Sequence, residues 1–203
     1  VNHWASNIEA EQGNRLARCQ MNASYVGCHG IKGFHTAFPA TYRVPKLSGQ
    51  GAGYLSAALH AYKSGERKHP SMRTLAASLS VQDIADLAAY YESTGTGATL
   101  APRAEPRAGK VAELVTKGAC ASCHGENFSK PISPAYPRIA GQHSDYLLAA
   151  LRSYQSEKPF IGRSNAIMAG VAKQFSLADL KLLADYMGSL PSELQTVQPV
   201  RFK

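Results

Sequence analysis

The sequence predicts an all-α protein of two tandem helical domains related by an internal repeat. Apolar residues recur at helical spacing in both halves, and no stretch alternates with the period of a strand, so strands are not expected. Matching residues recur 92 positions apart, which indicates a duplication. A stretch containing Pro102 and Pro106 has the composition of a linker. We therefore predict domains at residues 1–94 and 108–203, joined by a linker at 95–107.

The repeat is clearest around a Gly-Gln pair in each half, where identical residues keep the same offsets. The matched pairs are Pro45 and Pro137, Gly49 and Gly141, Gln50 and Gln142, Tyr54 and Tyr146, Leu59 and Leu151, and Tyr62 and Tyr154. So consistent a register over this distance is not expected by chance. The two halves should therefore share one fold and one kind of site.

Helices are expected at the start and end of each half. Ser6-x-x-Glu9 indicates the start of a first helix, and its counterpart near Val111 should end close to Gly118. Capping boxes at residues 80–83 and 176–179 predict the last helix of each half. Each of these helices carries one apolar stripe expected to face the core: Val81, Ile84, Leu87, Ala88 and Tyr91 in the first, and Leu177, Leu180, Leu183, Ala184 and Met187 in the second.

The most informative motif is Cys120-Ala121-Ser122-Cys123-His124 in the second half. Two thiols separated by two residues can add to the two vinyl groups of a haem, and the histidine that follows can bind its iron. A zinc half-site, a redox dithiol and a disulfide are the alternatives, but the adjacent His124 favours haem. We therefore predict thioethers at Cys120 and Cys123 and an iron ligand at His124.

The first half departs from this spacing. Cys28-His29-Gly30 matches the end of the motif, but Tyr25 stands where the first cysteine belongs, and the nearest other cysteine is Cys19. Cys19 could form the first thioether, it could stay free, or it could form a disulfide with Cys28. We favour the first reading, because two haems would then use all four cysteines, which suits an oxidising compartment. Cys19, Cys28 and His29 are the predicted haem residues of this half.

A second iron ligand is expected further along each half. Met72 and Met168 lie 43 and 44 residues after the histidines, and both come eight residues before the capping serine. A methionine at helical spacing is usually core, as expected for Met187. The polar neighbours of Met72 and Met168 instead predict a loop facing the iron. The other histidines have no match in the opposite half, and only His69 rivals Met72 as a ligand.

These motifs resemble those of class I c-type cytochromes, and the tandem is similar to dihaem cytochromes c4. The resemblance is carried by Cys120-x-x-Cys123-His124-Gly125, the segments 45–50 and 137–142, Met168 and the last helix of each half, and covers nearly the whole chain. It implies two cytochrome c-like domains related by a pseudo-twofold axis, with haem edges near their interface. It also implies that the carbonyls of Pro45 and Pro137 orient the proximal histidines. The Cys-x8-Cys-His spacing is a departure from the family.

The resemblance implies two covalently bound haem c groups and periplasmic electron transfer. Met and His together would close both irons, so we expect a carrier of single electrons and no enzyme. The donor would be a quinol-oxidising complex or a dehydrogenase, and the acceptor a redox protein such as a terminal oxidase. A haem subunit of a dehydrogenase, or a peroxidase-type enzyme with one labile ligand, is the alternative.

Charge and hydropathy bear on partners and location. The formal net charge of +8 favours partners with acidic docking surfaces. Nucleic acid is not expected, because the basic residues form no stripe with interleaved aromatics. No apolar run could span a membrane, which leaves peripheral association with membrane complexes open. The start at Val1 is typical of a mature chain after signal removal.

Overall fold

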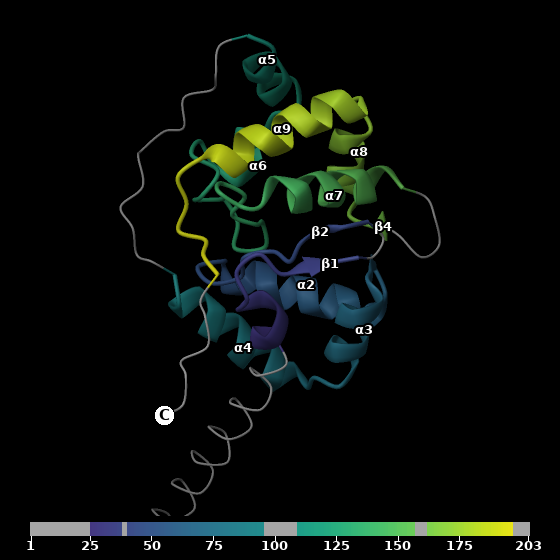
Figure 1. The fold of residues 1–203 in the computed structure, drawn as a ribbon, viewed down its shortest axis with the longest axis vertical. Coiled ribbons are helices and arrows are strands. Elements are labelled where there is room, and N and C mark those ends of the chain that lie inside the picture. The colour runs from purple at the N-terminus through teal and green to yellow at the C-terminus, as the bar shows by residue number, and fades with distance from the viewer. Residues whose placement is uncertain (1–24, 38–39, 96–108, 157–161, 197–203) are drawn as a thin grey trace, which may run out of the picture.

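The computed structural model shows two helical halves, one above the other in Figure 1. The residues that the structure describes are 25–37, 40–95, 109–156 and 162–196. Helices dominate both halves, which confirms the predicted all-α class. No helix in these four segments combines the length and apolarity needed to cross a bilayer.

Three helices of the first half have counterparts in the second. The first half contains α2 (Ala52–Ser64), α3 (Pro70–Ala77) and α4 (Val81–Ser93), and residues 25–29 are also helical. The second half contains α5 (Lys110–Lys117), α6 (Cys120–His124), α7 (Ser144–Gln155), α8 (Ala166–Ala172) and α9 (Leu177–Ser189). In both halves the long middle helix packs against the last one, α2 against α4 and α7 against α9. The internal repeat is therefore a structural repeat.

Both predicted capping boxes are present. The Ser80 side chain accepts a hydrogen bond from the Asp83 backbone N–H, and the Asp83 carboxylate accepts one from the Ser80 N–H. Ser176 and Asp179 make the same reciprocal pair at the start of α9. These bonds satisfy N–H groups that have no partner inside the helix, which explains why α4 and α9 begin where they do.

Each half has its own apolar core, built largely on the last helix. Ile84 and Leu180 are fully buried at equivalent places in α4 and α9. The predicted stripes are right except at their first members, since Val81 and Leu177 are 72% and 55% exposed. Each is the first residue of its helix, where the helix end projects past the core into solvent.

The expectation of no strands was wrong for four two-residue strands. These are β1 (His35–Thr36), β2 (Tyr42–Arg43), β3 (Arg67–Lys68) and β4 (Gly162–Arg163). Two residues are too few for an alternating pattern to show in a sequence. Strand β1 pairs with β2, whereas β3 pairs antiparallel with β4 of the other half and places Arg67 opposite Arg163.

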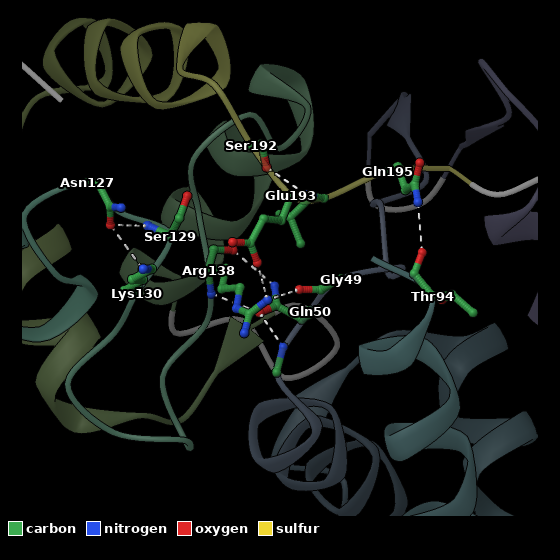
Figure 2. Close-up of polar contacts among 12 residues, drawn as sticks. Gly49, Gln50, Thr94, Asn127, Ser129, Lys130, Arg138, Ser192, Glu193 and Gln195 are labelled. Carbon is green, nitrogen blue, oxygen red and sulfur yellow. Dashed lines mark hydrogen bonds and ion pairs between the residues drawn. The ribbon is translucent and has the colours of Figure 1, made fainter. Parts of the chain in front are cut away.

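The two halves exchange the glutamines of the repeat across their interface. The Gln50 side chain donates to the Arg138 carbonyl at 3.0 Å and accepts from the Arg138 N–H at 2.8 Å (Figure 2). Gln142 makes the same pair of bonds with the backbone of Lys46, both at 3.0 Å. Because Arg138 and Lys46 are themselves equivalent in the repeat, this exchange has the pseudo-twofold symmetry expected from the sequence.

The segment after α9 breaks that symmetry. It leaves α9 and returns to the first half (Figure 1), where the Gln195 N–H donates to the Ser48 carbonyl at 3.0 Å. Figure 2 shows Gln195 beside Thr94. The Gln195 side chain also donates to the Thr94 carbonyl at 2.7 Å. The predicted helix from Ser6 and nearly all of the predicted linker lie outside the described residues, so the domain boundaries stay a prediction.

Candidate haem sites

The motif of the second half lies on the single short helix α6, which spans Cys120–His124. A helical turn brings positions three and four apart to one face, so Cys120, Cys123 and His124 lie close together. Gly125 ends this helix with φ of 79°, a backbone conformation that favours glycine. All three side chains line the same cavity.

His124 is fixed by a backbone carbonyl. Its Nδ1 lies 2.9 Å from the Pro137 carbonyl oxygen, and burial lowers the pKa of the imidazole. A neutral ring that donates from Nδ1 to Pro137 keeps a lone pair on Nε2, which is the form that binds iron. The contact expected between Pro137 and His124 is therefore present, and it sets the ring for ligation.

His29 repeats this arrangement in the first half. Its Nδ1 lies 2.8 Å from the Pro45 carbonyl oxygen. Burial lowers the pKa of His29 to about 4, although the hydrogen bond to Pro45 favours a higher pKa. Residues 25–29 are helical, so Cys28 and His29 stand on one turn, as their counterparts do in α6. Burial therefore favours the neutral form of both histidines, and equivalent prolines hold them.

Tyr25 occupies the position that Cys120 holds in the second half. Its side chain is 4% exposed and lines the cavity, its hydroxyl has no hydrogen-bond partner among the described residues, and burial raises its pKa to about 12. Cys28, Cys120 and Cys123 form no disulfide with one another. Cys19 lies outside the described residues, so its thioether stays a prediction.

Met72 and Met168 both line the cavity, but they lie in helices and not in the predicted loop. Each is the third residue of a short helix, α3 or α8. The His69 side chain accepts a hydrogen bond from the Met72 N–H at 3.4 Å, and Asn165 does the same for Met168 at 2.9 Å. His69 therefore has a counterpart after all: it caps α3 as Asn165 caps α8.

One cavity of about 560 Å³ connects these groups. In the first half it is lined by Cys28, His29 and Met72, and in the second by Cys120, Cys123, His124 and Met168. The remaining lining is mostly apolar, with Leu55, Leu59, Leu147 and Leu151 among it. Thiols, imidazoles and thioethers thus converge on an apolar space shared by the two halves.

Two arginines line this cavity, Arg67 buried and Arg163 half-buried. Arg67 is 9% exposed and stacks on the rings of Tyr54 and Tyr62, at 5.7 and 4.7 Å from their centroids. Arg163 stacks in the same way on Tyr146 and Tyr154, at 5.7 and 5.4 Å. Each guanidinium also donates to one tyrosine hydroxyl, Tyr54 at 3.3 Å and Tyr146 at 3.1 Å.

These two cations lack an anionic partner in the described part of the chain. No described carboxylate pairs with either guanidinium, and the Arg67 Nε is buried without a hydrogen-bond partner. Burial by itself would raise the pKa of Tyr146. The positive charges of Arg163 and Arg67 outweigh it and lower that pKa to about 8. A buried charge with no partner costs several kcal/mol, so the cavity is suited to a group that brings anions.

Haem fits every part of this donor set. Its vinyl groups can receive the thiols, its iron can take an imidazole and a thioether, and its propionates can offset the buried guanidiniums. The apolar lining suits the porphyrin face. The residues present therefore fit haem on grounds independent of the spacing of the motif.

Comparison with known proteins decides the family. The sequence profile of the cytochrome c family matches residues 108–191. Cytochrome c4 of Pseudomonas aeruginosa is 31% identical over 179 residues, covering 84% of this chain and 86% of that protein. The chain belongs to the cytochrome c4 family. Membership implies covalently bound haem c and a role in electron transfer with redox partners.

Two further relatives extend the match. The crystal structure of reduced cytochrome c4 from Pseudomonas stutzeri matches this chain with a TM-score of 0.63 and 28% sequence identity. The match covers 86% of this chain and 97% of that one. A protein of Stutzerimonas stutzeri described as a thiosulfate dehydrogenase electron acceptor is 29% identical over 171 residues, covering 80% and 77% of the two chains. The match to a solved cytochrome c4 supports the two-domain fold.

Sequence reasoning missed the arginine pair. Arg67 follows Tyr62 by five residues, whereas Arg163 follows Tyr154 by nine, so the repeat slips by four positions and the two arginines do not align. The signal available was their tyrosine partners, since Tyr54, Tyr62 and their counterparts all stand in the repeat.

Proposed function

We propose that this cytochrome c4 family member is a dihaem carrier of single electrons, with one haem c in each half. His29 and Met72 would bind the iron of the first haem, and His124 and Met168 that of the second. Cys120 and Cys123 would hold the second haem by thioethers, and Cys28 with Cys19 the first. The observation that supports this most is the duplicated set of histidine, proline carbonyl and methionine around one cavity.

The chain's own residues prepare each iron position. Pro45 and Pro137 keep a proton on Nδ1 of the proximal histidines and so aim Nε2 at the metal. The caps His69 and Asn165 fix the first turn of the helix that carries each methionine. When bound, the haem supplies a metal that gains and loses one electron. The protein holds the ligands still, so little rearrangement accompanies the transfer.

A sulfur ligand opposite histidine favours the ferrous state relative to two histidines and raises the reduction potential. If His29 with Met72 and His124 with Met168 held the two irons, neither iron would keep a free position for a substrate. We therefore infer a carrier and not an enzyme.

The proposed partners rest on the compartment and the charge. Haem attachment that uses all four cysteines suits the oxidising periplasm, where the donor would be a quinol-oxidising complex or a dehydrogenase and the acceptor a terminal oxidase. The net charge of +8 favours partners with acidic docking surfaces, including complexes at the membrane face.

Haem attachment can be read directly from mass. The intact protein, measured under denaturing conditions, is expected to carry two haems, and peptide mapping should place one across Cys120 and Cys123 and the other across Cys19 and Cys28. A single haem would contradict the dihaem proposal. A free Cys19 thiol would contradict only the double attachment in the first half.

The distal ligand of the first half can be tested with carbon monoxide. Met72→Ala is expected to open the first iron, so that the reduced variant binds carbon monoxide at one haem and the wild type at neither. The matched control is Met187→Ala, which truncates a core methionine that is 5% exposed and should cost about 2–5 kcal/mol of stability without opening an iron. Absence of binding by Met72→Ala would show that another group is the ligand.

The relative described as a thiosulfate dehydrogenase electron acceptor supports a second candidate, a haem subunit that serves one dehydrogenase. Tight co-purification with a catalytic subunit would favour it. Loss of the methionine-to-ferric-iron absorption band at one haem would instead point to a labile ligand and an enzymatic role.

A further inference from the structure

A second cavity, of about 500 Å³, lies where the two halves meet, outside the large cavity. Its charged and ionisable lining consists of Lys32, Arg43, Lys46 and His143. None of the described residues that line it is an aspartate or glutamate. Of its three cations, only Arg43 is paired with a described carboxylate, that of Asp145 at 3.0 Å.

The repeat shows what is missing at Lys46. Lys46 and Arg138 occupy equivalent positions and make equivalent bonds, the Lys46 Nζ to the Gly141 carbonyl at 2.7 Å and the Arg138 Nη1 to the Gly49 carbonyl at 2.6 Å. Arg138 is also bound by the Glu193 carboxylate at 2.7 Å, as Figure 2 shows. Lys46 has no such carboxylate among the described residues. Among the residues that the structure describes, one of the two equivalent interface cations is therefore paired with a carboxylate and the other is not.

The surroundings of Lys46 make its charge costly. Burial and the nearby Arg43 lower the pKa of Lys46. The pKa of His143 is lowered to about 4 by burial and by the charges of Arg43 and Lys46, and Asp145 opposes this shift. His143 also precedes the first residue of α7, whose first turn carries Asp145, the carboxylate that pairs with Arg43. A positive potential in a partly enclosed space favours an anion over water.

We propose that this interface cavity binds a small oxyanion of the sulfate or phosphate class, between Lys46 and Lys32. The anion would offset the positive charge of Lys46, as the Glu193 carboxylate offsets that of Arg138. Lys46 and Gln142 line both cavities, so the bound anion would lie on the far side of these two side chains from the haem space. The site does not depend on the identity of the axial ligands.

The test is calorimetric titration of the intact holoprotein with inorganic sulfate, and separately with inorganic phosphate, at low ionic strength. The wild type is expected to show one saturable site with a dissociation constant on the order of 1 mM or tighter. Lys46→Gln and Lys32→Gln should each weaken binding about tenfold, because each removes a charge-assisted hydrogen bond. The matched control Lys130→Gln removes an exposed lysine that lines neither cavity and should bind as the wild type does.

Lys46 also holds the interface, so Lys46→Gln could disturb the packing of the halves. Lys32 is exposed, and its replacement leaves that packing intact, so it provides an independent measurement. The proposal is overturned if the wild type shows no saturable binding of either anion. It is also overturned if Lys32→Gln and Lys130→Gln bind the anion equally well.

Discussion

Replacing Arg67 by methionine is expected to lower the reduction potential of the bound haem. Arg67 places a positive charge in the haem cavity that no described carboxylate offsets, and such a charge favours the ferrous state. A unit charge about 10 Å away at an effective dielectric constant of about 20 contributes roughly 1.7 kcal/mol, or roughly 70 mV for one electron. Methionine keeps the apolar stem over the tyrosine rings, so the loss should be mainly electrostatic. Spectroelectrochemical titration of the holoprotein measures it.

The matched control for this prediction is an exposed cation. Lys130→Gln removes the same formal charge from the surface, where water and salt screen it, and should leave the potentials nearly unchanged. Equal potentials in wild type and Arg67→Met would mean that the guanidinium does not act on the irons. Arg163→Met should reproduce the effect, because the two arginines face each other across the β3–β4 pair.

Gly125→Ala is expected to destabilise the second half severely. Gly125 ends helix α6 with φ of 79° and ψ of 160°, and a Cβ there would clash with the Lys130 carbonyl oxygen. This backbone region is open essentially only to glycine and costs an alanine about 1–3 kcal/mol, and the clash with backbone brings the expected loss to about 3 kcal/mol or more. Chemical denaturation of the holoprotein followed by far-ultraviolet circular dichroism measures it.

Gly170→Ala is the control of opposite sign. Gly170 lies inside α8, and a Cβ there would meet nothing within 4 Å. Alanine in a helix interior is favoured over glycine by about 1 kcal/mol, so this variant should be slightly more stable than the wild type. If the two variants had equal stability, the backbone at Gly125 would not be the strained point that its φ indicates.

The helical class, the repeat and the two capping boxes could be predicted because each depends on local spacing. Ser80 and Asp83, for instance, interact within one helical turn, so their sequence alone indicates the contact. The proline carbonyls that hold His29 and His124 came from a family resemblance and not from the residues themselves. Their geometry is consistent with the proposed iron ligands.

The interface contacts could not be predicted, because they join residues about 90 positions apart. The repeat shows which residues are equivalent, but it does not show which residues touch. Gln50 and Gln142 stood out as repeated residues, yet a repeat is compatible with two identical sites that never touch. The pairing of Arg67 with Arg163 is harder still, since like charges are not expected to face each other unless a third group neutralises them.

The exchanged glutamines carry an evolutionary consequence. The glutamine side chain of each half binds the backbone of the residue after the proline in the other half. Each half therefore contributes one side chain and one backbone partner to the interface. A face with this property is complementary to a copy of itself, which is the defining feature of an isologous dimer. The two halves therefore meet as the subunits of a homodimer would, and the covalent connection preserves in one chain the form of an assembly between two.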